Sequence, residues 1–382
     1  MRRSFAAVVL LCASLPLFAE SAHEALVRIG AIWSTGDRDR FATVLAPSFP
    51  GTPLHLARMK ARFRARCITV RSVTATITSE DDTRATGLLT FHIAESPRTG
   101  PPGELVDDVE VEMSAEGGSW RVVKWMRVVD AVALRLSEAA PSADVMAMTH
   151  PALPDRELVH ALERRTVDLS NLSRMAEAKK AAAAAQVIAE QLGDEPARVM
   201  ADLAELMAMT VPTVDPAARR RRILQLHERA LRTADPDAVT MTTAYVGRMY
   251  LDLDESSREA ERIFVRMVEQ DEEYSEPTTM VVAAARAGVT RLTRGDYRGA
   301  LQLFRRGLDR SIELQDPANS AYLRLHIGRI YDRQNDPELA VAEYRQGLQV
   351  VPRGTIPEAL IRQALARSLR RLGNAEEADR EL

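Results

Sequence analysis

The chain has 382 residues, which is enough for two or three domains rather than one small domain. Apolar residues make up 46% of the chain, enough for packed cores, whereas aromatic residues make up only 5%. The sequence has 54 acidic and 51 basic residues, so its formal net charge at pH 7 is only -3. This balance gives no overall electrostatic field for nucleic acid or an anionic membrane, and neither is an expected partner.

Residues 1–22 have the layout of a signal peptide. Arg2 and Arg3 form a basic start, residues 6–18 form an apolar stretch, and small residues after it offer cleavage points. This stretch is too short to span a bilayer, and no later stretch is long enough. We therefore expect an exported bacterial protein, periplasmic or secreted, with no membrane span in the mature chain. An uncleaved anchor and a lipoprotein signal at Cys12 are the alternatives.

Residues 23–132 are expected to form an α+β domain. The spacing of apolar residues predicts helices over 23–33, 38–45 and 53–63. Apolar and polar residues then alternate over three segments, and a fourth apolar segment follows at 120–129, which predicts a four-stranded antiparallel sheet. The residues expected to point inward from the first three strands are all apolar: Val73, Ala75, Ile77, Leu89, Phe91, Ile93, Val109, Val111 and Met113.

This order of helices and strands resembles the nuclear transport factor 2-like (SnoaL-like) cone fold. The segment from Trp33 through Gly36 and Asp37 to Phe41 and Phe49 carries the resemblance. That superfamily includes relatives of ketosteroid isomerase as well as non-catalytic modules. An isomerase-type site needs an acidic base and a polarising donor inside the cone, and the expected inward set contains no ionisable residue. The cone is therefore predicted to be non-catalytic, with room for a small apolar ligand.

Residues 133–150 are expected to form a linker, and residues 151–382 an all-α array of five to six helix pairs. The predicted pairs are 157–170 with 176–192, 197–209 with 217–233, 240–253 with 257–270, 278–293 with 297–314, 319–333 with 337–350, and 356–372 with 375–382. Only the last pair has a second helix too short for a full partner.

The clearest motif is Ile327–Tyr331, which is followed by Ala340, Tyr344 and Pro352. This pattern resembles the tetratricopeptide repeat (TPR). Forty residues earlier, a second copy has Gly288, Ala300 and Phe304 where this one has Gly328, Ala340 and Tyr344. Short side chains are expected where two helices cross closely, with the aromatic ring filling the space beneath. The resemblance implies a surface that binds a peptide or protein partner.

The expected function is therefore that of a non-catalytic exported scaffold for protein–protein interaction. The first helices of the last two pairs are expected to line a concave groove, and their arginines suit carboxylates. The predicted partner is thus a protein or an acidic peptide. The candidate partner-binding residues are Arg329, Arg333, Arg367, Arg370 and Arg371.

The sequence offers no sign of a metal site or cofactor, and no catalytic residue is predicted. Its seven histidines are scattered, and its glycines occur singly rather than in a phosphate-binding loop. Two alternative functions stay open. One is the regulatory N-terminal part of a larger CHAT-peptidase-like protein. The other is an enzymatic or small-molecule-binding cone that the repeats dock onto a partner.

Overall fold

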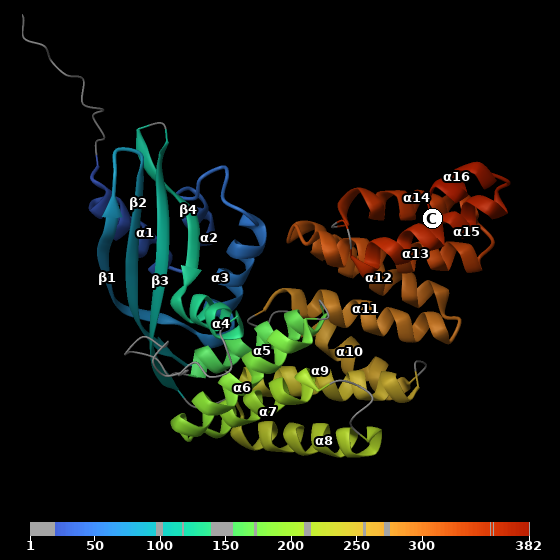
Figure 1. Ribbon diagram of the computed structural model, residues 1–382, viewed down its shortest axis with the longest axis horizontal. Helices are drawn as coiled ribbons and strands as arrows, with labels where there is room; N and C mark the ends of the chain where they lie inside the picture. Colours follow the sequence, from blue (N-terminus) through green and yellow to red (C-terminus); the bar gives the residue numbers. More distant parts are fainter. Residues whose placement is uncertain are drawn as a thin grey trace, which may run out of the picture.

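The structure is a computed structural model of the chain, shown in Figure 1. The residues that it describes are 20–96, 102–116, 118–138, 156–171, 174–209, 215–254, 257–270, 276–351, 353 and 355–381. Most of the predicted signal peptide, most of the predicted linker and Pro352 therefore lie outside the described residues. Within them, no helix combines the length and hydrophobicity needed to cross a membrane.

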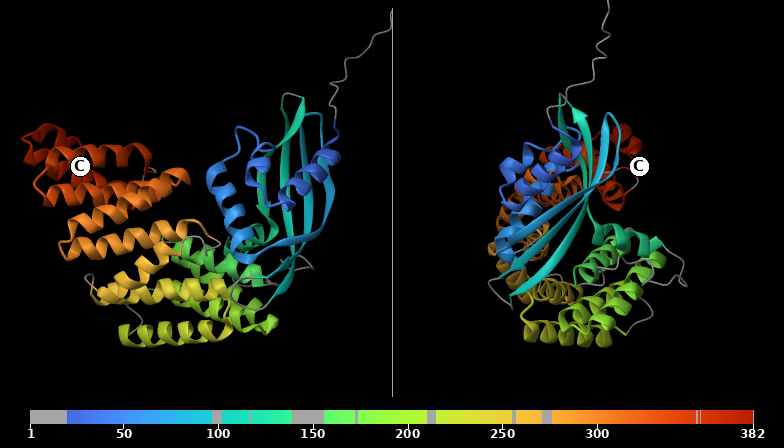
Figure 2. Two further views of the ribbon diagram at one scale, coloured as in Figure 1. Left: turned by 180° about the vertical axis from the view of Figure 1, so that it is seen from behind. Right: turned by 90° about the vertical axis from the view of Figure 1, so that its left-hand side faces the viewer.

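The N-terminal part, here called the sheet domain, contains three helices and four strands. The helices are α1 (Ala22–Ser34), α2 (Arg38–Ala42) and α3 (Thr52–Arg66). The strands are β1 (Thr69–Glu80), β2 (Arg84–Glu95), β3 (Gly103–Glu116) and β4 (Ser119–Arg127). They form one antiparallel sheet in the order β1-β2-β3-β4, as predicted. Figure 2 shows the three helices on one face of this sheet.

The core of the sheet domain lies between that face and the helices. Leu89 and Phe91 on β2 and Val111 on β3 have no exposed surface, which confirms the predicted alternation. Trp33 on α1 packs against Phe91, with their ring centroids 4.3 Å apart. It also meets the edge of Phe63 on α3, at a centroid distance of 5.1 Å. Both α1 and α3 are thus held to the sheet by aromatic contacts.

Helix α4 (Val128–Glu138) follows β4 directly. Residues 133–138, predicted as the start of a linker, are therefore helical. The reason is an apolar stripe at Val129, Val132 and Leu136, three to four residues apart, which faces the following helices. These side chains belong to the same core cluster as residues of the next two helices, so α4 packs as part of the core of the array.

The described residues from 156 onward contain helices and no strand. The helices are α5 (Arg156–Asn171), α6 (Met175–Leu192), α7 (Glu195–Ala208), α8 (Pro216–Thr233), α9 (Pro236–Leu253), α10 (Arg258–Glu269), α11 (Thr278–Thr293), α12 (Tyr297–Glu313), α13 (Pro317–Arg333), α14 (Pro337–Val350), α15 (Ile356–Arg371) and α16 (Ala375–Arg380). They match the predicted helices within a few residues. Figure 1 shows a curved stack that begins beside the sheet domain and continues from α10 into α11–α16, which we call the arm.

Aspartate followed by proline starts four of these helices. At Asp235 and Asp316, for example, the carboxylate accepts a hydrogen bond from a backbone N–H of the first turn, at 2.9 and 3.1 Å. The proline after each aspartate has no N–H to leave unpaired at this position. Such caps satisfy donors that the helix itself cannot, and they fix where each helix begins.

The glycines at the helix crossings explain the repeat motif. A Cβ atom at Gly288 would lie 2.4 Å from the ring of Phe304, and one at Gly328 would lie 2.4 Å from the ring of Tyr344. Both rings are fully buried. Gly247 faces Phe264 in the same way, at 2.7 Å. The predicted close crossing of short side chains over an aromatic ring is therefore confirmed in three successive pairs.

Candidate partner-binding surface

The inward face of the sheet is longer than the sequence pattern indicated. Beyond the nine apolar residues, it continues to Glu95 on β2 and Asp107 on β3, and both carboxyl groups are buried. The prediction that this face carries no ionisable residue is therefore wrong. Asp107 accepts hydrogen bonds from Arg62 at 2.6 Å and Arg127 at 2.9 Å, and Glu95 accepts one from Arg66 at 2.9 Å. These carboxylates are engaged by arginines.

The same arginines tie the sheet domain to the array. Arg66 at the end of α3 pairs with Glu157 on α5, at 3.3 Å, and with Asp237 on α9. Arg127 at the end of β4 pairs with Glu157 at 2.9 Å. Burial opposes ionisation of Glu157, but Arg66 and Arg127 hold the pKa of its carboxyl group well below the usual range. We call this network, with Arg62, Glu95 and Asp107, the buried joint.

A second contact joins the sheet domain to the arm. The Nε atom of Arg58 on α3 lies 2.9 Å from a carboxylate oxygen of Glu276, which precedes α11. Glu276 also accepts a hydrogen bond from the Thr278 hydroxyl at 2.9 Å, which fixes the carboxylate at the start of that helix. Leu54 and Ala57 of α3 pack against a core cluster of α11–α13. We call these interactions the α3–α11 contact.

Three of the five predicted partner-binding arginines are already engaged inside the array. Arg333 donates a hydrogen bond to the backbone oxygen of Leu292 at 3.1 Å, in the last turn of α11. Arg371 binds the backbone oxygen of Asp332 in the same manner at 3.1 Å, in the last turn of α13. Arg370 pairs with Asp379 at 2.8 Å. Arg333 and Arg371 thus cap the carboxyl ends of preceding helices, where a positive charge is favourable.

The other two predicted arginines stand at equivalent positions of neighbouring helices. Arg329 follows Gly328 on α13, and Arg367 follows Ala366 on α15. Arg367 is exposed and Arg329 is half-buried. Neither has a hydrogen bond or ion pair to another part of the described chain. The two helices pack directly against one another, so the two free guanidinium groups lie on adjacent helices of the arm.

A third free arginine was missed from the sequence. Arg286 on α11 has no ion pair within the described chain, and its guanidinium carbon lies 5.4 Å from the ring centroid of Phe264. Burial lowers the pKa of Arg286, and the nearby charge of Arg248 lowers it further. Arg286 stands two residues before Gly288, where the next repeat has His326 before Gly328, so the predicted arginines of α13 gave no signal for it.

His326 lies three residues before Arg329 on α13 and adds no charge to this surface. It is buried, neither ring nitrogen has a partner, and its ring stacks on Phe304 with centroids 5.3 Å apart. Burial, reinforced by the charges of Arg329 and Arg333, lowers its pKa to about 3. The imidazole is therefore neutral at physiological pH. We call Arg286, Arg329 and Arg367, on the first helices of three successive pairs, the arginine row.

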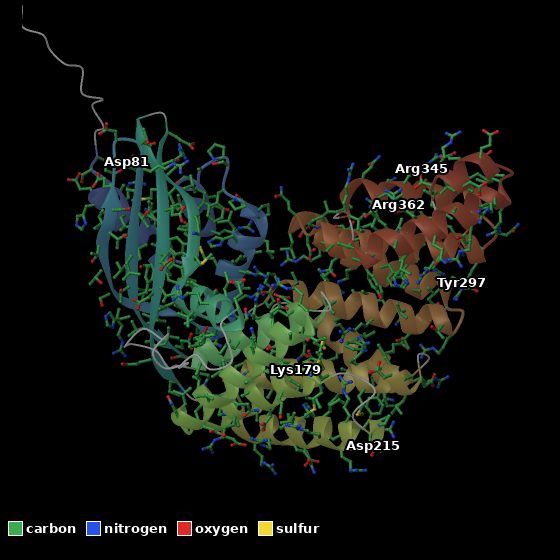
Figure 3. The ribbon with its side chains drawn as sticks, in the orientation of Figure 1. Asp81, Lys179, Asp215, Tyr297, Arg345 and Arg362 are labelled. Carbon is green, nitrogen blue, oxygen red and sulfur yellow. The ribbon has the colours of Figure 1, made fainter. Side chains whose placement is uncertain are left out.

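Arginines on other surfaces of the arm are mostly paired. Arg345 on α14 pairs with Glu377 at 2.6 Å, and Arg362 on α15 pairs with Glu381 at 2.7 Å. Figure 3 labels both residues on the arm. Each pair is partly exposed and spans two helices. Within the described chain, the arginine row lacks carboxylate partners, as does the exposed Arg298 on α12, whereas most arginines of the arm have one.

The four-arginine run 219–222 gives rise to a different surface. It lies on α8, where Arg221 and Arg222 line a hollow of about 480 Å³. Arg229 and Asp202 line the same hollow and pair with one another at 2.6 Å. Arg222 is itself paired with Glu205. Among the described residues, no group of three His, Cys, Asp or Glu side chains is placed to hold a metal ion.

No protein-family model matches the chain, and no curated protein matches it. Solved structures with similar helical arrays include a STAND signal-transduction ATPase with a tetratricopeptide repeat sensor from Pyrococcus horikoshii, at 10% identity and a TM-score of 0.46. That alignment covers 66% of this chain and 40% of the ATPase, so the chain spans less than half of that protein.

Two further similar structures are complexes of repeat proteins. A Rap protein with the Competence and Sporulation Factor has 18% identity and a TM-score of 0.43, covering 60% of this chain and 63% of that one. NprR with its cognate peptide NprX has 14% identity and a TM-score of 0.41, covering 66% and 75%.

Proposed function

We propose that this protein is a scaffold whose helical array, which resembles tetratricopeptide repeats, binds an acidic segment of a peptide or protein partner. The arginine row supports this proposal. Within the described chain, three guanidinium groups on the first helices of successive pairs lack a carboxylate partner, whereas most other arginines of the arm have one. Arginine forms bidentate, charge-assisted hydrogen bonds with carboxylates, so an acidic segment on this surface gains bonds that the free protein lacks.

The partial burial of Arg286 also favours a partner that carries carboxylates. Its guanidinium group lies against Phe264 and is close to the charge of Arg248. A bound carboxylate relieves the unfavourable burial of this charge, and water screens the interaction less here than at a fully exposed site. Arg286 is therefore expected to contribute more to binding than the exposed Arg367.

The proposal extends to the other parts of the chain. The sheet domain, with its resemblance to the nuclear transport factor 2-like cone, serves as a non-catalytic support for the array. Residues 1–22 direct export. Export is tested by fusing these residues to a reporter enzyme that is active only outside the cytoplasm. The fusion is expected to be active, and changing Arg2 and Arg3 to glutamate is expected to abolish that activity.

The test of partner binding is a titration of the full chain with fluorescent acidic and basic peptide pools. Acidic peptides are expected to bind, and a variant with Arg286→Glu and Arg329→Glu is expected to lose that binding. Arg298→Glu is the matched control. Arg298 is exposed and has no partner in the described chain, but it lies on α12, the second helix of its pair, whereas the arginine row lies on first helices. Equal binding of both pools, or equal losses in both variants, contradicts the proposal.

A further inference from the structure

The buried joint and the α3–α11 contact differ in how deeply their charges are buried. In the buried joint, the side chains of Asp107, Arg66 and Arg127 are only 1%, 13% and 18% exposed. Breaking such a network leaves charges stranded in a poorly solvated site, which is strongly unfavourable. Helix α4 adds an apolar core shared with α5 and α6. The sheet domain and the first helices of the array therefore move as one body.

The α3–α11 contact is much weaker. The side chains of Arg58 and Glu276 are 53% and 34% exposed, so water solvates both charges whether or not they are paired. An exposed pair of this kind favours the paired state only about two- to fivefold. The apolar part of the contact consists of Leu54 and Ala57, both only partly buried.

We propose that the α3–α11 contact is a latch, and that the arm α11–α16 opens away from α3 while the buried joint stays closed. Each helix pair of a stacked array touches mainly its neighbours, so small rotations between pairs add up without breaking a core. Opening separates α3 from the start of α11, the helix that carries Arg286. If the arginine row is the partner-binding surface, a segment that extends past Arg286 towards α3 favours the open state.

The experiment measures two distances by electron paramagnetic resonance of paired spin labels. Cys12→Ser and Cys67→Ser remove both native thiols. Labels at Val27→Cys on α1 and Leu339→Cys on α14 report the opening of the arm. Labels at Val27→Cys and Leu231→Cys on α8 report the buried joint. Val27 is 44% exposed, Leu339 46% and Leu231 55%, so labels at these positions disturb no core.

Each pair is measured in the parent protein, in Arg58→Glu and in Lys60→Glu. Lys60 is the matched control because it is exposed on the same helix and has no ion pair within the described chain. In Arg58→Glu, the population at long α1–α14 distances is expected to rise about threefold to tenfold, because an attraction becomes a repulsion. Lys60→Glu is expected to match the parent, and the α1–α8 distance is expected to stay the same in all three.

The charge-swapped variant Arg58→Glu/Glu276→Arg shows whether the effect of Arg58→Glu comes from the lost Arg58–Glu276 attraction or from a disturbed structure of α3. It restores an opposite-charge pair and is expected to return the α1–α14 distribution to that of the parent. The proposal is overturned if Arg58→Glu leaves this distribution unchanged, or if Lys60→Glu shifts it equally. It is also overturned if the α1–α8 distance changes as much as the α1–α14 distance, since the opening would then lie at the buried joint.

Discussion

The two halves of the helical array use the same helix-pair architecture for different purposes. In the first half, α5–α10, acidic groups such as Glu157 and Asp237 are buried and matched by arginines of the sheet domain. In the second half, α11–α16, pairs such as Arg345–Glu377 are partly exposed, and the arginine row has no carboxylate partner within the described chain. The first half therefore serves as a foundation and the second as an accessible arm. The predictions below test whether this division is real.

The largest effect is expected from breaking the buried joint. Arg66→Met removes the one positive charge that Glu95, Glu157 and Asp237 share as a partner, and these carboxylates stay poorly solvated. The free energy of unfolding is expected to fall by about 3–5 kcal/mol. The control is Arg362→Met in the arm, where the pair is partly exposed and the expected loss is at most about 1 kcal/mol. Urea denaturation measures both. Equal losses would mean that the two halves do not differ.

A second large effect is expected at Glu163 on α5. This side chain has no exposed surface, and neither carboxylate oxygen has a partner in the described chain. Burial raises its pKa from 4.5 to about 7. The folded state therefore holds a proton that the unfolded state releases, so stability falls as the pH rises from about 4.5 to about 7.

Glu163→Gln keeps the shape of the side chain and removes its titration. At pH 8 the variant is expected to be more stable than the parent by about 3 kcal/mol, and at pH 4 the two are expected to be similar. Chemical denaturation at both pH values gives the difference. Glu376→Gln, on the exposed face of α16, is the control and is expected to change little at either pH. A Glu163→Gln variant with the same pH dependence as the parent would contradict the assignment.

A smaller loss is expected at the crossing glycines of the arm. Gly328→Leu places a side chain where even a Cβ atom lies 2.4 Å from the ring of Tyr344. The helices must separate or the ring must move, at a cost of roughly 1–3 kcal/mol. Gly373→Ala is not a suitable control, because Gly373 has a positive φ of 83°. Gln363→Leu on the exposed side of α15 is suitable, and its melting temperature is expected to stay near that of the parent.

The smallest effect is expected from salt on partner binding. Arg367 is exposed and Arg329 is half-buried, so dissolved salt screens their attraction to an acidic segment. The affinity for such a segment is therefore expected to fall as ionic strength rises. Arg367→Ala is expected to cost at most about 1 kcal/mol of binding free energy and to reduce the salt dependence. Arg286→Ala is expected to cost more, because Arg286 is less solvated. Titrations at two salt concentrations compare the variants, and identical losses would remove the distinction.

The sequence predicted the array well because its signals are local. Apolar spacing, aspartate–proline starts and crossing glycines each act within one helix or one pair. The sequence pattern gives no sign of the buried joint, because the apolar alternation ends at Ile93 and Val109 whereas the strands continue to Glu95 and Asp107. The α3–α11 contact joins residues 218 positions apart, which no local pattern reveals.

Cys67 shows a similar limit at a single position. The apolar Ile68 follows it, and this neighbour alone predicts a buried thiol. The structure places Cys67 at the end of α3 with a positive φ of 44°, and its side chain is exposed. A left-handed residue that ends a helix turns the chain towards the first strand, and this change of direction moves the side chain away from the core. A burial prediction from neighbouring residues alone does not include such a turn.

Helix α4 has a consequence for where the array begins as a foldable unit. Val132 and Leu136 cover Leu158 and Leu162 of α5 in one core cluster, so α4 acts as the end cap that a stacked array needs for solubility. A fragment that starts at residue 128 keeps this cap, whereas one that starts at residue 151 leaves an apolar face open to water. The shorter fragment is therefore expected to aggregate, and the natural boundary of the array lies at the end of the sheet rather than after α4.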